Sequence, residues 1–137
     1  NEESATAYSN VLEMDPGHVD AATNLGALFR ETGYQAETVA VYRRLLKVRP
    51  EAFQIAFNLG VVQERMGRPE EAAQAYLQAS EAESEMGAFA LYRLGVMYEK
   101  LGQGGDAREA LTHFLSRWDG DEKIKIAAQT ILARLEN

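Results

Sequence analysis

Few side chains in this sequence combine the residue type and the spacing that catalysis or metal binding requires. The two histidines, His18 and His113, lie far apart in the chain, and cysteine is absent. Zinc sites usually draw on closely spaced His and Cys pairs, so neither histidine indicates a metal centre. Asp119-Gly120-Asp121-Glu122 lacks the alternating ligands and distant glutamate of a calcium loop. It predicts a helix N-cap instead, in which Asp119 or Asp121 accepts from free backbone N–H groups.

The patterns of nucleophilic catalysis and phosphate binding are missing too. No serine lies in a glycine elbow or has a partner base in its sequence context. Gly104-Gly105 is not followed by the Lys-Ser/Thr of a phosphate-binding loop, so we interpret it as a turn between helices. The acidic residues Glu81, Glu83 and Glu85 alternate around an expected helix end and should be solvated. We therefore predict that the protein is not an enzyme and has no cofactor or metal.

Composition favours one ordinary globular domain. The 137 residues fit a single domain, with 46% apolar and 26% charged residues. A net charge of -7 disfavours nucleic acid as a partner, because phosphate binding needs clustered Lys and Arg. No apolar run approaches the roughly 18 residues of a membrane span. The compartment stays unassigned, with the cytoplasm favoured. Because the chain begins at Asn1 inside a repeat, we expect a fragment or a processed chain.

The elements that must position any binding surface follow a repeat of 34 or 35 residues. The pairs Leu25-Gly26, Leu59-Gly60 and Leu94-Gly95 are separated by 34 and then 35 positions. A fixed period of this length is typical of stacked helical or mixed repeats. Other residues keep the same spacing: Gly33, Gly67 and Gly102; Tyr8, Tyr42 and Tyr76, with Leu111 in the next position; and Pro16 with Pro50.

These residues resemble the tetratricopeptide repeat, a helix-turn-helix unit. Five positions depart from its pattern: Thr38 stands for Ala, Gln63 and Leu111 stand for aromatics, and Ser84 and Asp119 stand for the closing Pro. None of them removes a Leu-Gly pair. The resemblance is carried by Ala22, Leu25, Gly26, Phe29, Tyr42 and Pro50, then Ala56, Leu59, Gly60, Ala72 and Tyr76, then Leu91, Leu94, Gly95, Tyr98 and Ala107.

The resemblance implies an all-α fold, a right-handed α-solenoid with seven helices. We expect a half repeat at 1–17, full repeats at 18–51, 52–86 and 87–120, and a capping helix at 121–137. Within the last two full repeats, we expect helices over 51–66, 69–83, 88–101 and 105–117. The first repeat is expected to hold helices over 18–32 and 36–48, after one over 2–14.

The last expected helix, 121–136, has the sequence of a cap. Gln129 stands where the repeat would place the glycine that lets a second helix approach. One stripe of the helix is apolar and the opposite side is polar, as the end of a solenoid requires. The stripe comprises Ile124, Ala127, Ala128, Ile131 and Leu135, and the polar side comprises Lys123, Lys125, Thr130 and Arg134.

In members of this family, one face of each repeat's first helix lines a concave groove that binds partners. Transfer of the repeat phase predicts a groove that is polar at its N-terminal end and aromatic or aliphatic at its C-terminal end. The same transfer also places Asp20, Thr23, Glu64 and Glu99 in this groove. The predicted partner-binding site comprises Asn24, Ala27, Arg30, Gln54, Phe57, Asn58, Val61, Phe89, Tyr92, Arg93, Val96 and Ile126.

Two interpretations of these residues stay open. Phe57, Phe89 and Tyr92 either contact a partner or fill the space between neighbouring first helices, with Ile126 against Tyr92. By the family resemblance, Asn24 and Asn58 would bond a peptide backbone through paired donor and acceptor groups, and Arg93 would meet a carboxylate. These asparagines are also common in the average repeat. The lysine clamp by which some relatives hold a C-terminal carboxylate is missing.

We therefore expect a protein-interaction scaffold that binds a peptide or helical segment of a protein partner. Replacement of Tyr92 by alanine should weaken that binding and leave the helices intact. The alternative is a structural segment or a regulatory appendage of a larger protein, without a peptide ligand. In that case the half repeat, with Tyr8, Val11 and Leu12 exposed, is a candidate surface for a homo-oligomer.

Overall fold

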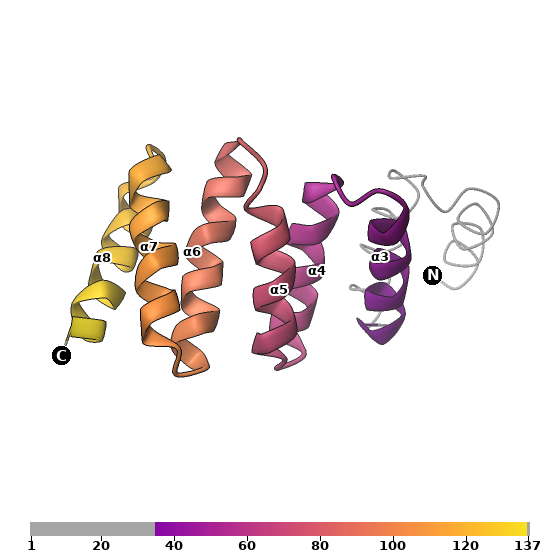
Figure 1. The fold of residues 1–137 in the computed structure, drawn as a ribbon, viewed down its shortest axis with the longest axis horizontal. Helices are drawn as coiled ribbons and strands as arrows, with labels where there is room; N and C mark the ends of the chain where they lie inside the picture. Colours follow the sequence, from indigo (N-terminus) through magenta and orange to yellow (C-terminus); the bar gives the residue numbers. More distant parts are fainter. Residues whose placement is uncertain (1–34, 137) are drawn as a thin grey trace.

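The computed structural model describes residues 35–136, which form a row of six helices connected by short turns (Figure 1). No strand occurs in this range. Consecutive helices pack against each other along the row, and α4 also contacts α6 directly. The helices are α3 (Gln35–Val48), α4 (Phe53–Arg65), α5 (Pro69–Ala79), α6 (Glu85–Lys100), α7 (Gly104–Arg117) and α8 (Glu122–Glu136).

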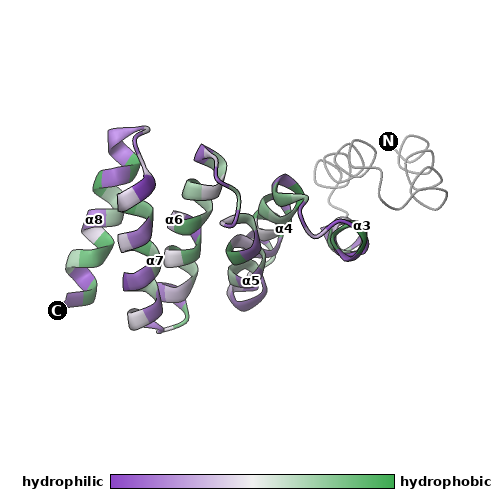
Figure 2. Ribbon diagram, turned by 45° about the horizontal axis from the view of Figure 1, so that its top comes forward, coloured by the Kyte–Doolittle hydropathy of each residue, from purple (hydrophilic) through white to green (hydrophobic). Residues whose placement is uncertain are grey.

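The arrangement is an all-α solenoid, as the repeat period predicted. α4 with α5, and α6 with α7, are the helix pairs of the two complete repeats in the described range. Figure 2 shows hydrophilic and hydrophobic residues interspersed along each helix, as expected for helices that bury one face. No helix among the described residues has the length and apolar character needed to cross a membrane.

The turn inside each pair depends on a repeated glycine. Gly67 follows α4 and Gly102 follows α6, and both have a φ of 74°. Glycine adopts this left-handed conformation without the steric cost that a Cβ brings, so it is the usual residue just after a helix. Pro69 then begins α5, where its fixed φ and missing N–H suit a first turn. The spacing of these glycines in the sequence predicted the turns correctly.

In the described range, the glycines of the Leu59-Gly60 and Leu94-Gly95 pairs let the two helices of a repeat pack closely. A Cβ on Gly60 would come within 2.7 Å of the Tyr76 ring, and one on Gly95 within 2.6 Å of Leu111. Tyr76 and Leu111 are fully buried. A side chain at either glycine would therefore separate the paired helices.

The buried side chains form two clusters along the row. The larger cluster runs from α4 to α8 and the smaller one joins α3, α4 and α5. The largest fully buried side chains in these clusters are Tyr42, Tyr76, Phe114, Leu45, Ile55, Met97 and Leu111.

One helix boundary differs from the prediction. The sequence predicted a helix over 69–83 followed by one over 88–101, but α5 ends at Ala79 and α6 already begins at Glu85. Arg117 explains the early end, because its guanidinium donates to the carbonyl oxygens of Ser80 and Ala82 at 3.2 and 2.8 Å. Ser84 then caps α6 by accepting from the backbone N–H of Gly87. Residues 80–84 are thus a loop held by a side chain 33 or more positions away.

α8 begins as its sequence suggested. Of the two predicted N-cap residues, Asp121 makes the bond, accepting from the Lys123 backbone N–H at 2.9 Å. Ala128 and Ile131 from the predicted apolar stripe are buried, and Ile124 and Leu135 pack against the larger cluster. Gln129 is exposed.

The expected total of seven helices was a miscount. The proposed boundaries contain one helix in the half repeat, two in each of three full repeats, and the capping helix, which is one more than seven. Six of these lie in the described range. The predicted helices over 2–14 and 18–32, and the half repeat with Tyr8, Val11 and Leu12, lie outside the described residues.

Candidate functional site

The predicted groove residues of the two complete repeats lie on the two first helices, α4 and α6. On α4, Phe57, Val61 and Glu64 follow one another at helical spacing and are half-buried. Residues three and four apart share one face of a helix. Gln54, one turn before Phe57, is exposed. Asn58 is half-buried beside it and accepts a hydrogen bond from Gln54 at 3.0 Å.

The second contribution comes from α6. Phe89, Tyr92, Arg93 and Val96 are all half-buried on this helix. Ile126, on α8, is 52% exposed, so it does not tuck into the protein as one of the two interpretations expected. Asn24, Ala27 and Arg30 lie outside the described residues.

The half-buried rings pack against one another. The Phe57 and Phe89 centroids are 5.8 Å apart, and the same distance separates Phe89 from Tyr92. The rings also reach inward, since Phe57 meets Tyr76 edge-on at 5.5 Å and Tyr92 lies 5.5 Å from the fully buried Phe114. They therefore fill the space between neighbouring first helices, as one interpretation expected, while part of each ring stays exposed.

Trp118 belongs to this ring cluster, although the sequence analysis did not identify it. Its ring lies 6.1 Å from that of Phe89 and stacks on Phe114 at 5.2 Å. Its indole N–H donates to the Asp121 carbonyl oxygen, which fixes the turn before α8. The available signal was that this is the only tryptophan in the chain and that it directly follows an expected helix.

Between α4 and α6 the surface is hollowed into an open cleft of about 320 Å³, which we call the α4–α6 cleft. Four of the predicted groove residues line it together: Phe57, Val61, Phe89 and Arg93. The remaining lining residues are Glu64, Arg65 and Tyr76. Tyr92 and Val96 lie on the same helix as Phe89 but do not line the cleft.

An ion pair spans the α4–α6 cleft. Arg93 donates through Nε and Nη2 to the two carboxylate oxygens of Glu64, and Tyr76 donates its hydroxyl to Glu64 Oε1 at 2.8 Å. Burial, reinforced by the hydrogen bond to the negatively charged Glu64, raises the pKa of Tyr76. The Arg93 guanidinium also lies over the Tyr92 ring, 5.8 Å from its centroid. Arg93 was expected to meet a partner's carboxylate, but it meets one inside the chain.

A second ion pair involves the next first helix, but its arginine does not stand at the position that corresponds to Arg93. Arg134 of α8 donates to both carboxylate oxygens of Glu99 on α6, at 2.9 and 3.2 Å. Each acidic residue near the end of a first helix is thus paired with an arginine of the helix that follows on that face. Ion pairs as well as ring contacts therefore connect neighbouring helices on this face.

Potential metal ligands do not cluster in the described range. No group of three or more His, Cys, Asp and Glu side chains is placed to hold a metal ion there. His113, Glu81, Glu83 and Glu85 are exposed.

Comparisons with known proteins agree with this architecture. A family profile described as tetratricopeptide repeat matches residues 36–85 and 65–122. A search of curated protein sequences gave no significant match. Three solved structures illustrate the likeness of the fold.

The structure of MamA matches with a TM-score of 0.71 at 19% identity, over 96% of this chain and 84% of that one. The Yersinia enterocolitica type III secretion chaperone SycD, solved with a peptide of the translocator YopD, matches with a TM-score of 0.73 at 11% identity, over 86% of this chain and 92% of that one. YrrB, described as a TPR protein with an unusual peptide-binding site, matches with a TM-score of 0.71 at 20% identity, over 95% of this chain and 66% of that one.

The family profile covers well over half of the sequence, and the glycines, turns and ring positions that define the repeat occupy the expected places in the structure. The chain therefore belongs to the tetratricopeptide repeat family.

Proposed function

We propose that the protein is an interaction module that binds a peptide or helical segment of a partner protein on the face formed by α4 and α6. The observation that carries the proposal is the α4–α6 cleft, where Phe57, Val61 and Phe89 leave part of their apolar surface open. Exposed apolar surface of this kind commonly marks an interaction site, and aromatic residues are favoured anchors.

The energetics suit reversible binding. These side chains are already half-buried in the free protein, so covering the remainder contributes about 1 kcal/mol for each of them. A few such contacts, less the cost of ordering the partner, give affinities of roughly micromolar strength. Two of the three solved structures named above, SycD and YrrB, are described with a peptide or a peptide-binding site, which supports a peptide as the ligand class.

The asparagine positions add a polar contact to the proposal. Asn58 accepts from Gln54 through its Oδ1, so a peptide backbone would have to displace Gln54 to use that oxygen. Gln54 is exposed and can move without loss of buried contacts. We propose that Asn58 sets the register of the bound segment, while Arg93 contributes by holding Glu64 rather than by binding the partner.

A matched pair of valines tests the proposal. Val61 lines the α4–α6 cleft, whereas Val48 at the end of α3 is 56% exposed and does not line it. Proteins from the host cell are captured on wild-type protein, on Val61→Asp and on Val48→Asp, after circular dichroism has established that all three are equally helical. A partner retained by Val48→Asp and lost by Val61→Asp is the expected result. A partner retained equally by both variants would remove the cleft from the mechanism.

A further inference from the structure

A second depression lies on the opposite side of the helix row, between α5 and α7, with α6 as its floor. Its volume is about 310 Å³, and we call it the α5–α7 groove. Apolar residues form its base and one wall, and the most prominent is Leu77, which is 51% exposed. The lining residues are Leu77, Ser80, Leu91, Leu94, Tyr98, Asp106, Glu109, Ala110 and His113.

The charges that line this groove are negative and unpaired. Asp106 and Glu109 lie one turn apart on α7, and neither forms an ion pair with any described residue. The pKa of Tyr98 is raised, mainly by burial and further by the negative charges of Asp106 and Glu109. Both carboxylates therefore lie close enough to Tyr98 to make the groove electrostatically negative. The cation nearest the Ser80 end, Arg117, is occupied by backbone carbonyl oxygens.

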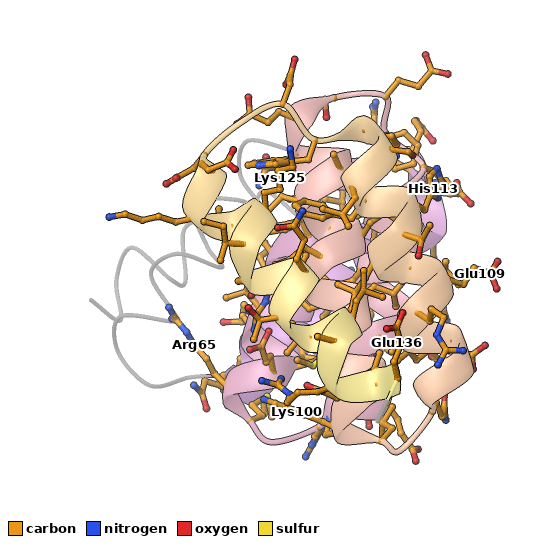
Figure 3. All side chains as sticks on the ribbon, turned by 90° about the vertical axis from the view of Figure 1, so that its left-hand side faces the viewer. Arg65, Lys100, Glu109, His113, Lys125 and Glu136 are labelled. Atoms are coloured by element: carbon orange, nitrogen blue, oxygen red, sulfur yellow. The ribbon has the colours of Figure 1, made fainter. Side chains whose placement is uncertain are left out.

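Figure 3 shows how these charges are distributed over the molecule. Glu109 and His113 project from α7 on one side of the molecule, and Arg65 and Lys100 lie on the other. Neither of these two cations therefore lies beside Glu109. Within the described range, the groove carboxylates have no ion-pair partner.

The equivalent depression one repeat earlier has the opposite character. The α3–α5 groove has about the same volume and is lined at corresponding positions, with Arg43 where Leu77 stands and Gln74 where Glu109 stands. Glu71, the counterpart of Asp106, is paired with Arg43 at 2.9 Å. Lys47 adds a further positive charge to that groove. Two equivalent grooves of neighbouring repeats therefore differ in charge. In the α3–α5 groove the carboxylate is paired and an extra lysine is present, whereas the α5–α7 groove has two unpaired carboxylates and an exposed leucine.

We propose that the α5–α7 groove is a second docking surface, which binds a segment of a partner protein that carries an apolar side chain flanked by lysine or arginine. The apolar side chain covers the exposed Leu77 above the buried Leu91 and Leu94, and the cations meet Asp106 and Glu109. This surface is separate from the α4–α6 cleft and does not depend on the function proposed for it.

Charge selects this occupant over the others. Phosphate-bearing nucleic acid and anionic lipid are repelled by two carboxylates that have no counter-ion. A second copy of the chain carries the same net charge of -7, so self-association at this groove is disfavoured over long range. A cationic and apolar segment is attracted by the carboxylates and buries the exposed leucine.

The test uses the full chain and three fluorescent peptides measured by anisotropy at two salt concentrations. The probe is the peptide Gly-Lys-Lys-Leu-Leu-Lys-Lys-Gly, and its controls replace either every Leu by Ser or every Lys by Glu. The probe should bind, and each control should bind about tenfold more weakly or not at all. Equal binding of the Ser control would show attraction by net charge alone, and no binding of the probe would also overturn the proposal.

Two double variants locate the binding. Asp106→Asn with Glu109→Gln removes the groove charges, whereas Glu122→Gln with Glu136→Gln removes two exposed carboxylates of α8 and changes the net charge equally. The first pair should weaken binding of the probe about tenfold and the second less than twofold. Equal weakening by both pairs would place the binding outside the groove.

A third variant converts one groove toward the other. Leu77→Arg introduces the residue that occupies the corresponding position, Arg43, in the α3–α5 groove. Leu77 is half exposed, so the helices should stay folded, which circular dichroism checks. Binding of the probe should be lost, because the arginine would pair with Asp106, as Arg43 pairs with Glu71, and because the apolar contact of Leu77 is removed. Unchanged binding would contradict the proposal.

Discussion

The α4–α6 cleft and the α5–α7 groove lie on opposite sides of the helix row. They differ in whether their charged side chains have partners within the protein. In the cleft, Glu64 has both Arg93 and Tyr76 as partners. In the groove, Asp106 and Glu109 have no ion-pair partner among the described residues. Side chains of the cleft therefore contribute to folding as well as to any binding, whereas the exposed Leu77, Asp106 and Glu109 of the groove can change without much effect on stability.

The largest expected difference concerns Tyr92, which packs on the cleft residue Phe89 without lining the cleft, and Leu77 of the groove. Tyr92→Ala removes a ring that packs on Phe89 and on the buried Phe114, so it should lower the free energy of unfolding by about 2–3 kcal/mol. From the sequence, we expected this change to weaken binding and to leave the helices intact. Leu77→Ala, at a side chain that is 51% exposed, should change stability by less than about 0.5 kcal/mol. Urea denaturation followed by circular dichroism measures both, and equal losses would contradict the distinction.

The next effect is that of breaking the ion pair in the cleft. Glu64→Gln leaves the half-buried Arg93 without a counter-charge and weakens the acceptor of Tyr76, so we expect a loss of about 2 kcal/mol. The double variant Glu64→Gln with Arg93→Gln should lose less than the sum of the two single changes. Strict additivity in this cycle would mean that the pair contributes nothing to stability.

The sequence predicted the repeat well because each repeat must satisfy the same packing. Gly60 and Gly95 face a buried side chain of the partner helix, and any larger residue would collide with it. Gly67 and Gly102 share one backbone conformation, so they recur with the same period. Because each repeat has this requirement, the glycines recur at a fixed spacing in the sequence. That spacing allowed the helices and their turns to be predicted.

The contacts between repeats could not be predicted in this way. Glu64 and Arg93 lie 29 positions apart, and the residues that correspond to Arg93 in the earlier repeats, Asn24 and Asn58, cannot form such a pair. Arg117 reaches the loop after α5 across 35 positions and donates to the Ala82 carbonyl oxygen. Interactions that occur once have no period, so only the folded arrangement shows them.

Alkaline pH acts on a tyrosine of each surface, Tyr76 in the cleft and Tyr98 in the groove, and Tyr76 can be tested by itself. Burial and the hydrogen bond to Glu64 raise the pKa of Tyr76 above the ordinary value of 10.0. Above that value the unfolded chain loses the tyrosine proton while the folded chain keeps it, so stability falls as pH rises, by about 1.4 kcal/mol per pH unit for this group. Below it the contribution is constant.

Tyr76→Phe isolates this effect. The variant lacks the hydrogen bond to Glu64 at every pH, but its unfolding free energy should fall less steeply than that of the wild type above pH 10.0. Urea titrations at a series of alkaline pH values measure the two slopes. Identical slopes would show that Tyr76 ionises equally easily in the folded and the unfolded chain.

The smallest expected effect concerns Gln63, which extends the comparison to the α3–α5 groove. Gln63 is 2% exposed, and its Oε1 has no hydrogen-bond partner among the described residues, whereas the corresponding residue of the next repeat is Tyr98. Gln63→Met keeps the volume and removes the unsatisfied oxygen, so it should raise the unfolding free energy by about 1 kcal/mol. Tyr98→Phe is the matched control and should change stability by only a few tenths of a kcal/mol. If Gln63→Met is destabilising instead, the Gln63 amide has a hydrogen-bond partner in solution. The buried polar group of the α3–α5 groove would then be as fully hydrogen-bonded as those of the α4–α6 cleft.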